Sequence, residues 1–224
     1  MDTDKQKTPF RWRAFAREMA AVVLGILIAL GLQQLVEARH TSQQVEEAHR
    51  ALTQELQGMA ANATRRIAVH PCVERRLQEV EAVLSDLDHG VRVGQVADFG
   101  RPIGANNSDG VWRALTSAGV LAHFRTDELV TYGKIYTIGE EIGSWSTMGG
   151  QDWSTIKLIV GDADRLTLSD RSMIRVAINH TRALEVVWTR TMPQQLGRAR
   201  KLGVALSPLP DLSAAPECLP LKRG

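Results

Sequence analysis

A long uncharged and mostly apolar segment lies near the start of the chain. No charged residue occurs between Glu18 and Glu37, and the stretch from Met19 to Leu32 contains no polar side chain. A water-soluble helix needs a solvated face, which this stretch cannot provide, whereas the stretch suits the hydrocarbon core of a bilayer. Flanking apolar side chains lengthen it toward the roughly 20 residues that a spanning helix needs. We therefore predict a transmembrane anchor helix over residues 18–38, with the lipid bilayer as its partner.

The charges that flank this segment predict its orientation. The chain carries a net charge of +2, and residues 1–18 account for all of it. Five basic side chains precede the span: Lys5, Lys7, Arg11, Arg13 and Arg17. By the positive-inside rule the basic tail of residues 1–17 lies in the cytoplasm and the chain after the span lies outside it. A cleaved signal peptide is the alternative, because the apolar core is short; no A-x-A site follows the core, which favours a retained anchor.

Small residues recur at four-residue intervals within the span, at Ala21, Gly25 and Ala29. This spacing lets a second membrane helix approach one face closely. It predicts a homodimer or another membrane partner. The alternative is that small residues are simply common in membrane helices.

The hydrophobic pattern beyond the span predicts an all-α body over residues 39–206. An amphipathic stripe over 41–69 continues from the anchor, Pro71 breaks or kinks the helix, and a second stripe follows as far as His89-Gly90. Residues 90–110 hold no periodic pattern and are expected to form a long loop.

Helical patterns resume at Val111. Thr126 is expected to cap one helix, Gly149-Gly150 to separate it from a short segment, and Ser169-Asp170 to cap a last helix that Pro193 kinks or ends. The proline-rich residues 207–224 are expected to form an extended strap. The predicted fold is one N-terminal transmembrane helix running into an extracytoplasmic bundle of four to six helices.

A resemblance supports the predicted location. The segment from Glu18 to Leu30, EMAAVVLGILIAL, resembles the anchor of a group of uncharacterised bacterial single-pass membrane proteins, in which a glutamate precedes a V-x-x-G-I-L-I-A-L span. The segments Cys72–Leu77 and Trp112–Gly119, and Tyr132 and Tyr136 after them, look similar to the proteobacterial members. The resemblance implies an anchor in the inner (cytoplasmic) membrane and a periplasmic helical region. It implies no activity.

The chain has two cysteines, Cys72 and Cys218. In an oxidising compartment such a pair favours a disulfide, which would tie the strap to the first helical hairpin. Two unrelated thiols and a link between chains are the alternatives.

No catalytic, cofactor or metal-binding motif stands out. The six histidines lack the spacing of a helical metal site, and neither glycine-rich phosphate loops nor a G-x-S-x-G elbow occurs. The neutral body argues against nucleic acid as a partner. Five aromatic residues could line a pocket or form an interface, although such residues more often fill a core: Trp112, Tyr132, Tyr136, Trp145 and Trp153.

These patterns favour a membrane-anchored, non-enzymatic interaction or accessory module with a protein partner or a second copy. This function predicts an exposed apolar or aromatic patch on the bundle around Trp145–Trp153, and a small-residue face in the membrane. A ligand-sensing domain that signals through a partner and an enzyme with an unrecognised site are the alternatives.

Overall fold

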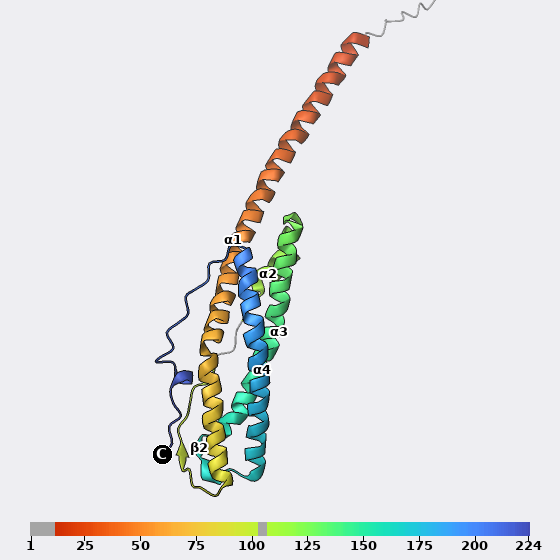
Figure 1. The fold of residues 1–224 in the computed structure, drawn as a ribbon. Helices are drawn as coiled ribbons and strands as arrows, with labels where there is room; N and C mark the ends of the chain where they lie inside the picture. The colour runs from red at the N-terminus through yellow and green to blue at the C-terminus, as the bar shows by residue number, and fades with distance from the viewer. Residues whose placement is uncertain (1–11, 103–106) are drawn as a thin grey trace, which may run out of the picture. The chain divides into compact units, whose positions relative to one another are not determined.

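The computed structural model describes residues 12–102 and 107–224, and these residues form four α-helices with one two-stranded sheet and short 3-10 turns between them (Figure 1). The all-α class is thus confirmed. Four helices in the described residues also fall within the predicted range of four to six.

The first helix, α1, runs from Trp12 to Asp88 and contributes to two compact units, which meet in sequence between Glu47 and Ala48. In the first unit an 18-residue window has a mean hydropathy of 2.2, and none of it is buried. This helix is long and apolar enough to cross a membrane, and a signal sequence would meet the same criteria.

Pro71 does not end the helix, and the predicted break at this position is wrong. Pro71 lies inside α1 with an exposed side chain. Proline removes one backbone hydrogen bond and crowds the preceding turn. Val69 and Val73 on either side are only 2% and 1% exposed. Burial of both neighbours holds the backbone helical through a residue that would otherwise end it.

Three long helices build the second unit. They are the part of α1 from Ala48 onward, α3 (Thr126–Ile156) and α4 (Leu168–Lys201), accompanied by the short α2 (Gly110–Ser117). Arg171 near the start of α4 pairs with Asp88 at the end of α1, and Glu185 farther along α4 reaches back to His70. These contacts make α4 antiparallel to α1 (Figure 1).

The inward positions of α1 and α4 both advance in alternating steps of four and three residues. In α1 they are Leu52, Leu56, Met59, Ala63, Arg66, His70, Val73, Leu77, Val80, Leu84 and Leu87. In α4 they are Ile174, Ile178, Thr181, Glu185, Trp188, Met192, Gln195 and Ala199. This repeat is that of a coiled-coil seam. All of these side chains are buried except His70, which is partly exposed.

Four local predictions about the helices of the second unit need correction. Gly149-Gly150 lies inside α3 and does not interrupt it, and Pro193 does not end α4, which continues to Lys201. Thr126 is the first residue of α3, and the N-cap position belongs to Arg125. Ser169 and Asp170 lie in the first turn of α4, and its N-cap is Thr167, whose hydroxyl accepts from the amide of Asp170 while the Asp170 carboxylate accepts from the amide of Thr167. This reciprocal pair is a capping box.

In its described residues, 90–102 and 107–110, the predicted loop holds one strand, and it ends at the start of α2. Strand β1 (Gln95–Val96) pairs antiparallel with β2 (Gly161–Asp162). The carboxylate of Asp164 accepts hydrogen bonds from the amides of Val93, at 2.8 Å, and Gly94, at 3.3 Å. The Val93 amide is the main reason why the pKa of Asp164 is lowered. Asp164 therefore fixes the course of this loop.

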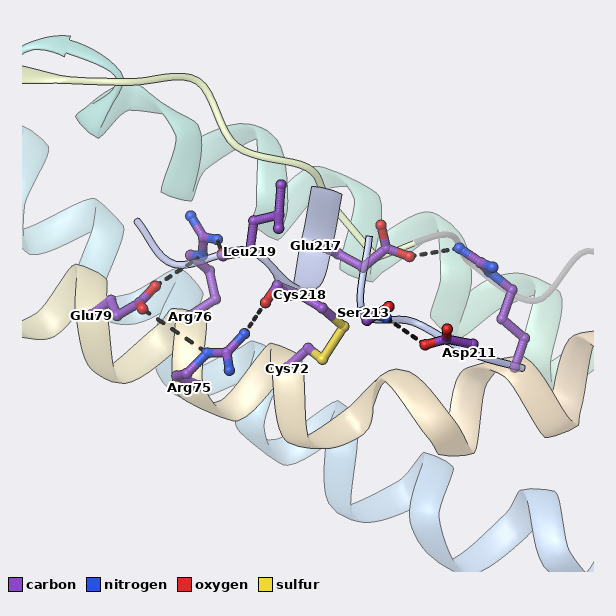
Figure 2. The surroundings of a disulfide bond; sticks show 10 residues. Cys72, Arg75, Arg76, Glu79, Asp211, Ser213, Glu217, Cys218 and Leu219 are labelled. Carbon is purple, nitrogen blue, oxygen red and sulfur yellow. Dashed lines mark hydrogen bonds and ion pairs between the residues drawn. A yellow bond between two sulfur atoms is a disulfide. The ribbon is translucent and has the colours of Figure 1, made fainter. Parts of the chain in front are cut away.

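The residues from Ser207 onward lie as an extended strap along α1, with one 3-10 turn at Pro216–Cys218 (η4) (Figure 2). Arginines of α1 donate to it: Arg75 to the carbonyl of Cys218 and Arg76 to that of Leu219. Arg65 pairs with the buried Glu217 at 2.7 Å. The loop before α2 approaches the strap closely, because a β-carbon at Gly100 would lie 2.7 Å from the Glu217 backbone nitrogen.

Cys72 and Cys218 form a disulfide, with their α-carbons 4.8 Å apart (Figure 2). Cys72 lies in the middle of the uninterrupted α1, so the predicted first hairpin does not exist. The disulfide therefore ties the strap to the side of one helix.

Replacing Pro71 by alanine is expected to stabilise the protein. Alanine restores the backbone donor and suits a helix interior better than proline, which costs up to about 3 kcal/mol there. Because Pro71 is exposed, the change removes no core contact. The melting temperature of the detergent-solubilised full-length protein, followed by circular dichroism, should rise by several degrees. A lower melting temperature than that of the parent protein would mean that the proline ring stabilises the fold at this position.

Replacing Cys72 or Cys218 by serine is expected to lower stability equally. Closing a loop of 146 residues stabilises by about 5 kcal/mol in the chain-entropy model. The double variant should be no less stable than either single variant, because each change alone already removes the bond. Denaturant titration of all four proteins measures this, and clearly unequal single variants would contradict an intramolecular disulfide.

Candidate ligand-binding cavity

The five aromatic residues singled out from the sequence fall into two separate groups. Trp112, Tyr132 and Tyr136 gather where α2 meets α3, and the rings of Trp112 and Tyr136 stack at 4.8 Å. Trp145 and Trp153 lie farther along α3 and line a cavity of about 390 Å³. Trp153 is 4% exposed and Trp145 is partly buried, so neither ring is a fully exposed surface.

The first group serves to hold α2. The Tyr136 hydroxyl donates to Glu55 at 2.7 Å, and the same carboxylate accepts from the amides of Val111, at 3.0 Å, and Trp112, at 3.3 Å. A carboxylate suits the free amides of a helix N-terminus. Burial, followed by the bond to Glu55, raises the pKa of Tyr136. The tyrosine therefore stays protonated and acts as a structural donor.

The cavity exists because one side of α3 lacks side chains. Gly143, Gly149 and Gly150 lie along its wall. A β-carbon at Gly143 would meet no atom within 4 Å, and one at Gly150 would meet only the tip of Arg101, at 3.9 Å. Glycine costs a helix about 1 kcal/mol relative to alanine. Here the missing side chains of these glycines leave open space between α3 and the facing helices α1 and α4.

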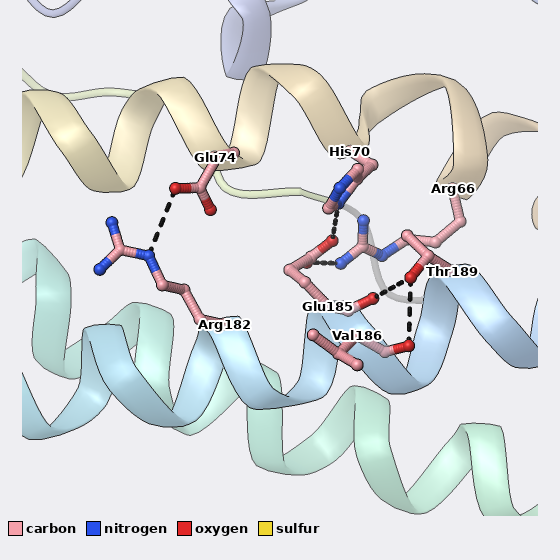
Figure 3. A network of polar contacts seen from close by, with 7 residues as sticks. All are labelled: Arg66, His70, Glu74, Arg182, Glu185, Val186 and Thr189. Atoms are coloured by element: carbon pink, nitrogen blue, oxygen red, sulfur yellow. Dashed lines mark hydrogen bonds and ion pairs between the residues drawn. The ribbon is translucent and has the colours of Figure 1, made fainter.

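Arg66 and Glu185, which both line the cavity, belong to one network of polar contacts (Figure 3). Arg66 of α1 donates to one oxygen of Glu185 on α4, and the other oxygen of Glu185 contacts Nδ1 of His70 at 2.8 Å. Arg66 is 7% exposed and Glu185 is 3% exposed. The Arg66 guanidinium also lies over the Trp188 ring, 4.6 Å from its centroid. Charge pairing and a cation–π contact thus fix this arginine in one orientation.

Two hydrogen-bond donors at the cavity have no partner among the described residues. They are Nη1 of Arg66 and the hydroxyl of Thr181, both buried. Leaving such a group unpaired costs about 1–3 kcal/mol. Arg101, an exposed residue after β1, brings a second guanidinium to the wall of the cavity. The site therefore combines three tryptophans with an excess of donors and of positive charge.

The sequence pattern predicts only part of this site. Trp188 and Thr181 lie on the last predicted helix, and both are buried. Arg66 is buried as well, although a charged side chain is typical of a solvated helix face. A four–three repeat continued from Leu52 through Pro71 places Arg66 and His70 on the seam, and the predicted helix break at Pro71 hides this signal.

The other predicted sites stay predictions. Ala21, Gly25 and Ala29 are exposed in this single chain, which leaves their proposed packing against a second helix open. In the part of the chain that the structure describes, no group of three or more histidine, cysteine, aspartate or glutamate residues is placed to hold a metal ion.

Comparisons with models of protein families, with curated proteins and with solved structures give no significant match to this chain. The geometry of its own residues therefore carries the functional argument.

Breaking the buried pair from one side is expected to destabilise the body strongly. Glu185→Gln leaves Arg66 as a buried charge without a carboxylate, a change that typically costs about 3–5 kcal/mol. Arg66→Met combined with Glu185→Leu removes both charges and should recover most of that loss. Urea titration of the full-length protein measures both variants.

Arg182→Gln provides the matched control. Arg182 also joins α4 to α1, pairing with Glu81 at 2.6 Å, but its side chain is 32% exposed. Exposed pairs contribute about 1 kcal/mol or less. A loss in Glu185→Gln no larger than that in Arg182→Gln would show that the first pair contributes no more than a surface contact.

Proposed function

We propose that the chain is a single-pass membrane protein whose helical body is held at the extracytoplasmic face, where it acts by binding, as a non-enzymatic interaction or accessory module. One observation carries this proposal. The helix α1 begins with an uncharged apolar stretch in which no residue is buried, and it continues as part of a packed body that a disulfide closes.

The exposed stretch supports a lipid environment. Its large side chains are about half exposed, including Leu24 at 58%, Leu27 at 60% and Ile28 at 55%. Each apolar side chain moved from water into hydrocarbon contributes about 1.5–3 kcal/mol, so several of them together favour insertion strongly. A helix also satisfies its own backbone groups, as a spanning segment must.

The disulfide and the flanking charges support the orientation. Disulfides persist in oxidising compartments outside the cytoplasm. The basic residues before the span favour a cytoplasmic N-terminus. The two arguments use different parts of the chain and agree. The resemblance of the anchor to bacterial membrane proteins adds the inner membrane and the periplasm to this proposal.

The pairing of charged groups supports binding rather than catalysis. Arg182 bridges Glu74 and Glu81, Arg171 reaches Asp88, and Glu55 holds α2. These groups join helices to one another, and such structural ion pairs are distinct from the convergent acid and base of an active site. The cavity beside Arg66 favours a second candidate function, a ligand-binding sensor that signals through a partner.

Labelling of introduced cysteines tests the topology. Ser42→Cys, just after the predicted span, should react with a membrane-impermeant maleimide in intact cells. Thr8→Cys, in the basic tail, should react only after the membrane is permeabilised. The parent protein, whose cysteines are joined, is the control. The reverse pattern would place the body in the cytoplasm and overturn the proposal.

An N-terminal epitope tag separates an anchor from a signal sequence. A retained anchor keeps the tag on the body in the carbonate-washed membrane fraction, whereas cleavage releases an untagged soluble body.

Replacing Leu24 and Ile28 by arginine should abolish membrane retention, because each charge at the centre of a span costs about 2.5–3.5 kcal/mol.

A further inference from the structure

We infer that the cavity between α1, α3 and α4 is a binding site for a small aromatic carboxylate, with its ring among Trp145, Trp153 and Trp188 and its carboxylate toward Arg66. This inference does not depend on the side of the membrane on which the body lies.

The cavity has the size and lining of a small-molecule site. Its volume of about 390 Å³ falls within the range of ligand pockets, and its wall combines aromatic surface with a few polar groups. Three of the five tryptophans in the chain contribute to it. Trp153 and Trp188 are 4% exposed, so their rings are held by the surrounding core and offer a rigid surface for a flat ring.

The arrangement of charge selects an anion. Glu185 is the carboxylate on the wall, and its two oxygens are already engaged by Arg66 and His70. Against this one negative charge stand the guanidinium groups of Arg66 and Arg101. A cage of tryptophans alone would also suit an organic cation. Here the excess positive charge opposes a cation and favours a carboxylate.

The unpaired hydrogen-bond donors at the cavity also favour a carboxylate ligand. Nη1 of Arg66 and the Thr181 hydroxyl are buried without a partner among the described residues, although both side chains line the cavity. A carboxylate is an acceptor with two oxygens, and guanidinium groups bind it with charge-assisted hydrogen bonds. Because Glu185 and Trp188 already fix Arg66, little side-chain freedom is lost on binding.

Three indoles that differ in charge test the inference directly. Indole-3-acetate, indole-3-acetamide and tryptamine carry the same ring with a negative, neutral or positive side chain at pH 7.5. Calorimetric titration into the full-length protein in lipid nanodiscs should show the acetate binding at least about tenfold more tightly than the amide, consistent with about 1.4 kcal/mol for one charge-assisted contact. Tryptamine should bind more weakly than both. Equal binding of the three indoles, or tightest binding of tryptamine, would overturn the inference.

Two glycine substitutions in α3 establish where the indole binds. Gly150→Leu places a side chain in the cavity, where its β-carbon meets only the flexible end of Arg101, and should weaken indole-3-acetate binding at least tenfold. Gly133→Leu makes the same change on the same helix, where a β-carbon also meets nothing within 4 Å, and should bind like the parent. Both changes improve helix propensity, so neither is expected to lower the melting temperature.

Replacing Arg101, which is exposed, tests the contribution of positive charge to ligand binding without disturbing the core. Arg101→Gln should weaken indole-3-acetate binding severalfold and leave the amide unaffected. Unchanged acetate binding in Gly150→Leu, or failure of the acetate to bind the parent protein, would show that the cavity is not this site. Neither result bears on the cysteine-labelling pattern, which tests the proposed membrane topology separately.

Discussion

The register of the helical body depends on the buried pair between Arg66 and Glu185. A seam of apolar residues in steps of four and three buries similar surface when one helix slides by a full heptad. Such a slide would place Arg66 opposite Ile178 or Met192 in place of Glu185, leaving a buried charge without a partner. That penalty amounts to several kcal/mol, whereas the apolar contacts change little. The buried pair therefore favours one alignment of α1 and α4, together with the more exposed pairs Arg171–Asp88 and Arg182–Glu81, and both of its members line the cavity.

A second set of arginines performs a different task on α1. Arg65, Arg75 and Arg76 face the strap and donate to Glu217 and to the carbonyls of Cys218 and Leu219. Proline has no amide hydrogen, so a proline-rich strap offers more acceptors than donors. The arginine guanidinium groups donate hydrogen bonds to the backbone carbonyls of the strap, which therefore needs no neighbouring β-strand. Burial lowers the pKa of Arg76, and its carbonyl contact and Glu79 compensate for that burial.

The sequence predicted the elements that depend on long regular patterns and missed those that depend on tertiary packing. The exposed apolar stretch of α1, the all-α class and the Cys72–Cys218 pair follow from hydropathy, periodicity and composition. The continuity of α1 through Pro71 and of α3 through Gly149-Gly150 does not, because core contacts on both sides override local propensity. Trp145 and Trp153 are candidate pocket residues in the sequence and both line the cavity, whereas Arg66 stands out in no motif. Arg66 is ordinary for a solvated helix face, and its contact with Glu185, 119 residues later, joins two distant parts of the sequence.

The disulfide also sets an order of events in the making of this protein. Cys218 follows all four helices in the sequence, so its bond to Cys72 closes only after α2, α3 and α4 have been synthesised. Until then Cys72 is a reactive thiol on the side of α1, open to oxidation or to a wrong partner. Oxidation of this one pair is therefore a late checkpoint in biogenesis, and the ratio of bonded to free Cys72 reports how much of the newly made protein has completed its fold.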